Sequence, residues 1–105
     1  MSPPWNPPNK NEDFEIHIAL EDYANPGNFK DTPTIASGDF QVSKDGGAYA
    51  NLTTLPAVEP AGTETVLIAL SSTEMNADSV VVRGIDQTSP KEWADFILSI
   101  PTTSA

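Results

Sequence analysis

Short runs of alternating hydrophobic and polar residues recur along this chain. The first run, residues 14–20, reads FEIHIAL and places Phe14, Ile16, Ile18 and Leu20 on one face of an extended segment. Such patterns, with β-branched and aromatic residues, favour half-buried or buried strands. Comparable runs occupy residues 39–44, 48–52, 64–70, 79–85 and 93–100. The pattern therefore predicts about six or seven short strands.

Turn-forming residues separate these runs. Residues 25–28 read NPGN within a loop that spans residues 21–37, where we expect Phe29 and Ile35 to pack at the edge of the core. Residues 45–47 read DGG and predict a hairpin, because glycine supplies the positive φ that tight hairpin turns need. Prolines at positions 56 and 60 are expected to end strand pairing.

One short helical turn is expected near residues 72–76. Ser71 would cap its N-terminus, and Glu74, three residues later, would complete a capping box. Met75 would pack from this turn onto the core.

Strands and turns in this order predict an all-β fold. Turn signals recur about every 8–12 residues, which is typical of a sandwich or a small barrel. We predict a small immunoglobulin-like β-sandwich, a term used for architecture alone because the chain has no cysteine. The predicted domains are an extended Pro-rich arm at residues 1–12 and the β-sandwich domain at residues 13–105.

The N-terminal arm is the first candidate interaction site. Four prolines surround Trp5, and such a segment favours extended geometry over a helix or a central strand. We expect the arm to dock against a neighbouring chain or its own domain, with Trp5 as the anchor; the alternative is a disordered tail. The predicted interface residues are Trp5, Pro3, Pro4, Pro7, Pro8, His17 and Tyr23.

Charge and composition narrow the function classes. The 105 residues carry a net charge of −10, and their five cations are widely scattered. No basic stripe is present to neutralise phosphates, so we expect no binding to nucleic acid or to anionic membranes. The alternative reading of the acidity is that it only aids solubility. We also expect no signal peptide and no membrane span, since the N-terminus lacks a basic region and no long apolar run exists.

Catalytic chemistry finds little support in these residues. His17 is the single histidine and lies mid-strand beside Glu15, which favours a surface or interface role. Without cysteine and with one histidine, nucleophilic catalysis and zinc binding are disfavoured. No calcium-loop spacing occurs, and a loop cation site at Asn76 and Asp78 is a minor alternative. We therefore expect no catalytic residues, no metal, no cofactor and no enzymatic activity.

Two segments of the chain resemble a known module. Residues 38–56 read GDFQVSKDGGAYANLTTLP and residues 70–86 read LSSTEMNADSVVVRGID, with a later Trp93-Ala94-Asp95. In these motifs the chain resembles a small β-sandwich module of tailed-bacteriophage and prophage virion structural proteins. The resemblance covers residues 14–100 and leaves the arm outside.

The resemblance implies structural work in a virus particle and no catalytic residues. The implied location is the virion, assembled in the cytoplasm of the host bacterium, with capsid, portal, neck or tail subunits as partners. Independently of the resemblance, we expect a homo-oligomer, because self-association through the arm would add the burial that this small core lacks. Capsid decoration or a neck (head–tail) component is the preferred role. The alternatives are a tail or fibre adaptor and a carbohydrate-binding host-attachment module, which would gather exposed aromatics on one face.

Overall fold

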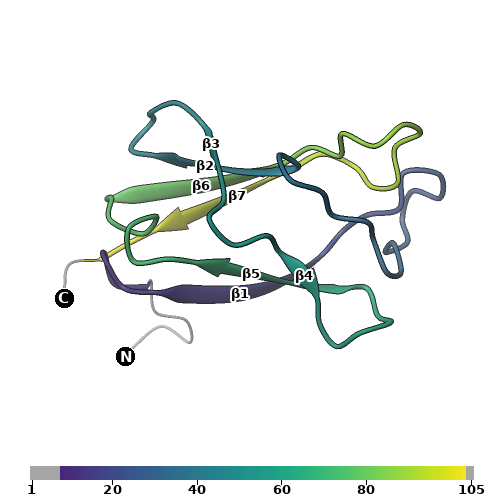
Figure 1. The fold of residues 1–105 in the computed structure, drawn as a ribbon, viewed down its shortest axis with the longest axis horizontal. Helices are drawn as coiled ribbons and strands as arrows, with labels where there is room; N and C mark the ends of the chain where they lie inside the picture. The colour runs from purple at the N-terminus through teal and green to yellow at the C-terminus, as the bar shows by residue number, and fades with distance from the viewer. Residues whose placement is uncertain (1–7, 104–105) are drawn as a thin grey trace.

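Within the described part of the chain, seven strands form two antiparallel sheets (Figure 1). The computed structural model describes residues 8–103. One sheet has three strands in the order β1-β5-β4, and the other has four in the order β3-β2-β6-β7. The strands are β1 (Phe14–Ala19), β2 (Phe40–Lys44), β3 (Ala50–Asn51), β4 (Ala57–Val58), β5 (Thr65–Leu70), β6 (Ser79–Gly84) and β7 (Phe96–Pro101). The predicted all-β class is confirmed, and the arrangement is that of a small β-sandwich.

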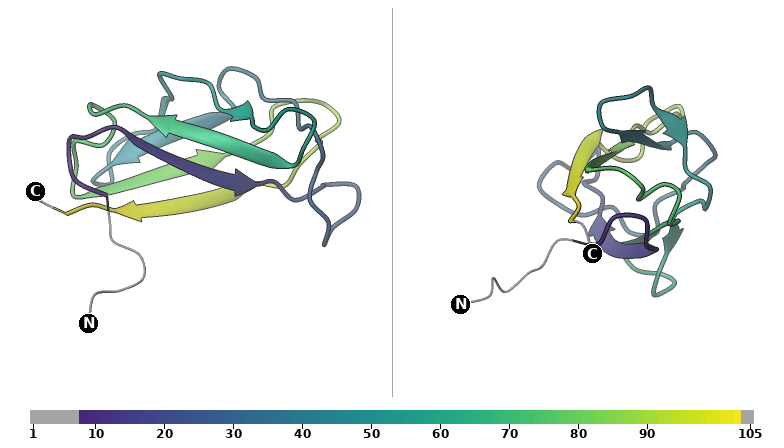
Figure 2. Two further views of the ribbon diagram at one scale, coloured as in Figure 1. Left: turned by 90° about the horizontal axis from the view of Figure 1, so that it is seen from below. Right: turned by 90° about the vertical axis from the view of Figure 1, so that its left-hand side faces the viewer.

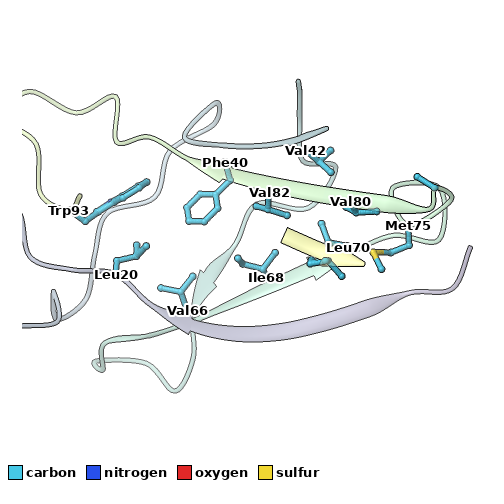
Figure 3. Packing of buried hydrophobic residues seen from close by; sticks show 12 residues of the cluster. Leu20, Phe40, Val42, Val66, Ile68, Leu70, Met75, Val80, Val82 and Trp93 are labelled. Atoms are coloured by element: carbon cyan, nitrogen blue, oxygen red, sulfur yellow. The ribbon is translucent and has the colours of Figure 1, made fainter. Parts of the chain in front are cut away.

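The core lies between the two sheets (Figure 3). The inner strands β5 and β6 point every second residue inward, as the period of a strand requires. Val66, Ile68 and Leu70 on β5, and Val80 and Val82 on β6, are all buried. Phe40, Val42, Met75, Ala77, Trp93, Leu20 and Ile100 complete the buried hydrophobic cluster.

The sequence pattern located the five longer strands and misjudged three segments. The expected strand over residues 48–52 is only two residues long in β3, since residues 47–49 leave the ladder. The expected start of the last strand at Trp93 is wrong, because β7 begins at Phe96. The loop between the two prolines contains β4, which pairs Ala57 with Leu67 and Val58 with Val66.

The hairpin between β2 and β3 has the predicted turn. Asp45 and Gly46 have φ values of 51° and 77°, and the N–H of Gly47 donates to the carbonyl of Lys44 at 2.9 Å. Two successive positive φ values match the right-handed twist of the flanking strands. The Asp45 carboxylate also accepts the N–H groups of Asp78 and Ser79, each at 3.0 Å. This turn therefore also fixes the start of β6.

Residues 72–75 form a turn, and the described residues contain no helix. The capping-box hydrogen bonds are nevertheless present: Ser71 N–H donates to Glu74 Oε1 at 2.8 Å, and Glu74 N–H donates to Ser71 Oγ at 3.2 Å. The other Glu74 oxygen accepts the N–H of Thr53 at 2.9 Å. Met75 is buried, as expected. The segment returns at once to the extended chain of β6, so the turn does not propagate.

Candidate interaction surface

One side of the sandwich is bordered by the edge strands β1 and β7. Both are six-residue edge strands, and within residues 8–103 each forms a sheet with a strand on one side only; both border the same side (Figure 2). Their inward-facing Phe14, Ile16, Ile18, Phe96 and Leu98 are only partly buried against the core. On the inner strands the equivalent residues are fully buried. No strand pair joins β1 to β7 among residues 8–103.

The opposite side presents a different edge. β3 and β4 have two residues each, and Ala50, Asn51 and Ala57 are exposed there. Short edge strands with small or polar residues offer little template for pairing with another chain. The β1/β7 side is therefore the stronger candidate for an interaction.

The last residues of the predicted arm already belong to the β1/β7 side. Asn9 and Thr103 form a parallel bridge, and Lys10 N–H donates to Thr103 O at 2.8 Å. Asn11 N–H donates to Met75 O at 3.0 Å, and Lys10 forms an ion pair with Asp78 at 2.6 Å. Residues 8–11 thus lie on their own domain. The candidate residues Pro3, Pro4, Trp5 and Pro7 lie outside the described part of the chain, so their role stays a prediction.

His17 and Tyr23, the other predicted interface residues, do not lie together. His17 is exposed on the outer face of β1, opposite Leu67 of β5. Tyr23 is 55% exposed in the loop that follows β1, where the Lys91 ammonium lies 5.8 Å from the centre of its ring. Phe29, in the same loop, is 64% exposed, so the expectation that it packs on the core is wrong. Its backbone bridges Glu21 in a small hairpin at the molecular surface; Ile35 does pack against the core.

Two long loops at one end of the sandwich are hydrogen-bonded to each other. Residues 20–39 connect β1 to β2, and residues 85–95 connect β6 to β7. Tyr23 N–H donates to Glu92 O, and Ala94 N–H donates to Glu21 O, each at 3.0 Å. Trp93 is buried, and its indole N–H donates to Thr34 O at 3.1 Å. The two loops therefore form one ordered end, with Trp93 as its central side chain.

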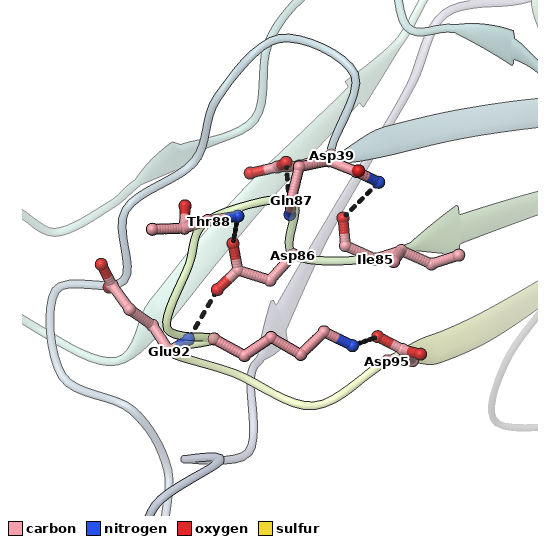
Figure 4. Close-up of polar contacts among 8 residues, drawn as sticks. Asp39, Ile85, Asp86, Gln87, Thr88, Glu92 and Asp95 are labelled. Carbon is pink, nitrogen blue, oxygen red and sulfur yellow. Dashed lines mark hydrogen bonds and ion pairs between the residues drawn. The ribbon is translucent and has the colours of Figure 1, made fainter.

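Buried carboxylates hold this end in place (Figure 4). Asp39 is 1% exposed and accepts the N–H groups of Ala36 at 2.9 Å and Gln87 at 3.1 Å. Asp86 is 3% exposed and accepts the N–H groups of Thr88 at 2.8 Å and Glu92 at 2.7 Å. A carboxylate that accepts two backbone N–H groups gains charge-assisted hydrogen bonds, and these offset the free-energy cost of burying it. These carboxylates are explained by loop structure and need no substrate.

The Asp86 environment also shifts its acidity. Burial alone would raise the pKa of this carboxyl, but the backbone N–H groups of Glu92 and Thr88 outweigh it and hold the pKa below its ordinary value of 3.8. The charged form is therefore the one that the folded chain stabilises. The pattern D-x-T at residues 86–88 is a local turn signal that sequence reasoning could have used.

The outer face of the four-stranded sheet carries one polar row. The Arg83 guanidinium lies 3.8 Å from the ring centre of Tyr49 and donates to Gln41, whose amide donates to Asn51 at 3.2 Å. Next to this row lies a shallow hollow of about 400 Å³, lined by Arg83, Ile85, Asp95, Phe96 and Ile97. A second hollow of about 330 Å³ lies beside the β2–β3 hairpin and Glu74. Neither hollow brings His17 together with a carboxylate.

No group of three or more histidine, aspartate or glutamate side chains within residues 8–103 is placed to hold a metal ion. The described residues, 8–103, also contain no long apolar helix of the kind that spans a membrane.

Comparison with known proteins assigns this chain to no family. No protein-family model matches this chain, and no curated protein or solved structure is significantly similar to it.

Proposed function

We propose that this chain is a non-enzymatic structural protein of a tailed-bacteriophage virion. It binds a larger assembly through its N-terminal arm and its strand edges, as a capsid decoration protein or a neck (head–tail) component. Its partners are other virion proteins and further copies of itself, with no nucleic acid or membrane involved. It acts in the virion, after assembly in the cytoplasm of the host bacterium.

The β1/β7 side, as residues 8–103 form it, is the observation that carries this proposal. Two long edge strands there border partly buried Phe14, Ile16, Ile18, Phe96 and Leu98. A strand edge with free backbone groups is a template for an added strand, and covering the apolar row would bury more surface. The resemblance of residues 38–56 and 70–86 to phage virion modules is the reason for proposing that the assembly is a phage virion.

The finer architecture proposed is immunoglobulin-like. Support comes from the strand order, in which β1-β5-β4 faces β3-β2-β6-β7 and the chain crosses repeatedly between the sheets. In such a sandwich the loops gather at the two ends. The ordered loop end of this chain, with residues 20–39 and 85–95, fits that description.

The direct test is the protein content of purified particles. Tailed-phage particles produced by bacteria that carry this sequence would be banded by density and analysed by quantitative mass spectrometry. The proposal expects the chain in the particle band at a fixed ratio to the major capsid protein. A copy that lacks residues 2–12, supplied in the same cells, is expected to be incorporated less. Recovery of the intact chain only from the soluble fraction of the lysate would contradict the proposal.

A host-attachment role, through glycan binding, is the second candidate. Tyr23 and Phe29 favour it, because both are strongly exposed and both lie in the loop that follows β1. Exposed aromatic rings are common platforms for sugars. Binding to host surface glycans that is lost in Tyr23→Ala and Phe29→Ala, with incorporation into particles unchanged, would favour this role.

A further inference from the structure

The edge of β1 that faces away from β5 meets no strand within residues 8–103 (Figure 2). Its backbone groups can be assigned from the sheet register. Glu59 N–H donates to Thr65 O at 2.9 Å, so the backbone groups of Thr65 on β5 face β4. Successive backbone groups of a strand point to alternate sides, so Ile16, whose partner lies three residues beyond Thr65, bonds to β5. On β1 the N–H and C=O groups of Glu15 and His17 therefore face the outer edge.

This edge is complementary to a copy of itself. Glu15 and His17 are both exposed on the outer face of β1, with Ile16 between them. When two copies of β1 run antiparallel about a twofold axis at Ile16, Glu15 of each copy lies directly opposite His17 of the other. Both residues turn their backbone groups to the shared edge, so each such pair exchanges both of its backbone hydrogen bonds.

We propose that β1 pairs antiparallel with β1 of a second copy of this chain, centred on Ile16. In this register the Cβ atoms of Glu15 and of His17 in the second copy lie about 5.5 Å apart, and the carboxylate can accept a hydrogen bond from the imidazole. A shift of two residues one way sets Glu15 against Glu15, and like charges directly opposite destabilise a sheet. The same shift the other way sets His17 against His17 and leaves both carboxylates without an imidazole. The side chains therefore select one register among its neighbours.

The same pairing covers part of the apolar row on the β1/β7 side. Directly opposite residues project to the same face of a sheet, so Ile16 meets Ile16 of the second copy on the inner face, and Phe14 meets Ile18. All three side chains are only partly buried in the single chain. The three-stranded sheet thus continues from one copy into the next, and apolar surface on both copies is buried together.

The inference rests on the strand-edge part of the proposed function, but its test uses the purified intact chain, so it can fail while incorporation into particles succeeds, and the reverse. Sedimentation velocity over a range of concentrations measures self-association at physiological ionic strength, which screens the net charge of −10 on each copy. Glu15→Lys is expected to raise the concentration needed for association roughly tenfold, because both symmetric pairs lose their acceptor. His17→Lys keeps a donor opposite the carboxylate and should preserve association. The double variant Glu15→Lys/His17→Glu exchanges the two partners and should restore it.

Glu59→Lys is the matched control. Glu59 is exposed beside β4, on the other edge of the same sheet, and the substitution makes the same change in net charge. It is not expected to weaken association. A chain that stays monomeric at every concentration would overturn the proposal. Association that Glu15→Lys leaves unchanged, or that Glu59→Lys weakens equally, would overturn the register.

Amide hydrogen exchange gives a second readout on the unmodified protein. The amides of Glu15 and His17 should become protected as the protein concentration rises, whereas the amide of Ile16, which points to β5, should not change. Protection of Glu15 and His17 that is independent of concentration would mean that their own chain covers the edge, and this result would also overturn the proposal.

Discussion

A substitution at Gly84 tests how β6 and β7 pack against each other. It lies on β6 directly opposite Phe96 of β7, and the Phe96 ring covers it. A Cβ at this position would lie 2.1 Å from one ring carbon and 2.6 Å from the next. Such contacts are far inside van der Waals distance, so the ring must move in a Gly84→Ala variant.

The sign of the change in unfolding free energy on Gly84→Ala shows which of two opposing effects is larger: the lost freedom of the unfolded chain or the crowding of the Phe96 ring. In an open strand position, replacing glycine by alanine stabilises a protein by about 0.4–1 kcal/mol, because it restricts the unfolded chain. Forcing an extra methyl group into a packed site costs about 1–3 kcal/mol. The Phe96 ring also contacts Phe40 and Trp93, with ring centres 5.6 and 6.4 Å away, so its freedom to move is limited. We therefore expect a net destabilisation of about 1–3 kcal/mol.

Chemical denaturation of Gly84→Ala, Phe96→Ala and the double variant measures this directly. Phe96→Ala alone is expected to cost about 2–3 kcal/mol, below the 3–5 kcal/mol typical of a fully buried ring, because Phe96 is only partly buried. In the Phe96→Ala background the space is free, so Gly84→Ala should become neutral or stabilising. A stabilising Gly84→Ala in the wild-type background, or equal effects in both backgrounds, would refute the described contact.

Three further predictions concern other parts of the chain. Asp86→Asn should lose about 1–3 kcal/mol at pH 7, since the amide cannot accept both backbone donors on equal terms. Because the pKa of Asp86 is lowered from 3.8, its contribution is present above that pH and is lost as the pH falls through the lowered pKa. Unfolding curves of the two proteins should therefore converge in acid, and a constant difference would contradict the assignment. In dilute protein, Glu15→Lys on the exposed face of β1 should change stability by less than about 0.5 kcal/mol, and a large loss of the melting midpoint would place that face in a core. Deletion of residues 2–12 should lower the melting midpoint more than deletion of residues 2–7, because only the longer deletion removes the bonds of Lys10 and Asn11; equal midpoints would show that these bonds add no stability.

The strands were predictable because they depend on local alternation and on turn chemistry. FEIHIAL at residues 14–20 and the DGG turn carry their signals in adjacent residues. β4 has only two residues, between Pro56 and Pro60, and this length is too short for an alternation of hydrophobic and polar residues to show; its pairing with β5 is what defines it. The short extent of β3 and the start of β7 depend in the same way on tertiary contacts.

The candidate surface was less accessible to sequence reasoning. Alternation along 14–20 and 93–100 indicates an inward row, but the exposure of that row depends on which strands lie at the sheet edges. The anchoring of residues 8–11 on Thr103 joins the two ends of the chain, and no local signal encodes it. Asp39 is the first residue of one predicted strand and Asp86 follows another, yet their burial follows from the folding of two loops onto each other.

The mass of the native protein in solution is the most direct test of assembly through the arm and the β1/β7 side. Light scattering would be recorded over a range of concentrations for the intact chain and for the variant that lacks residues 2–7. If the arm adds to the pairing of β1, the intact chain should be larger than a dimer, and the variant should be a dimer. An intact chain that stays monomeric at every concentration, or an oligomer unaffected by the deletion, would contradict self-assembly through the arm and this side.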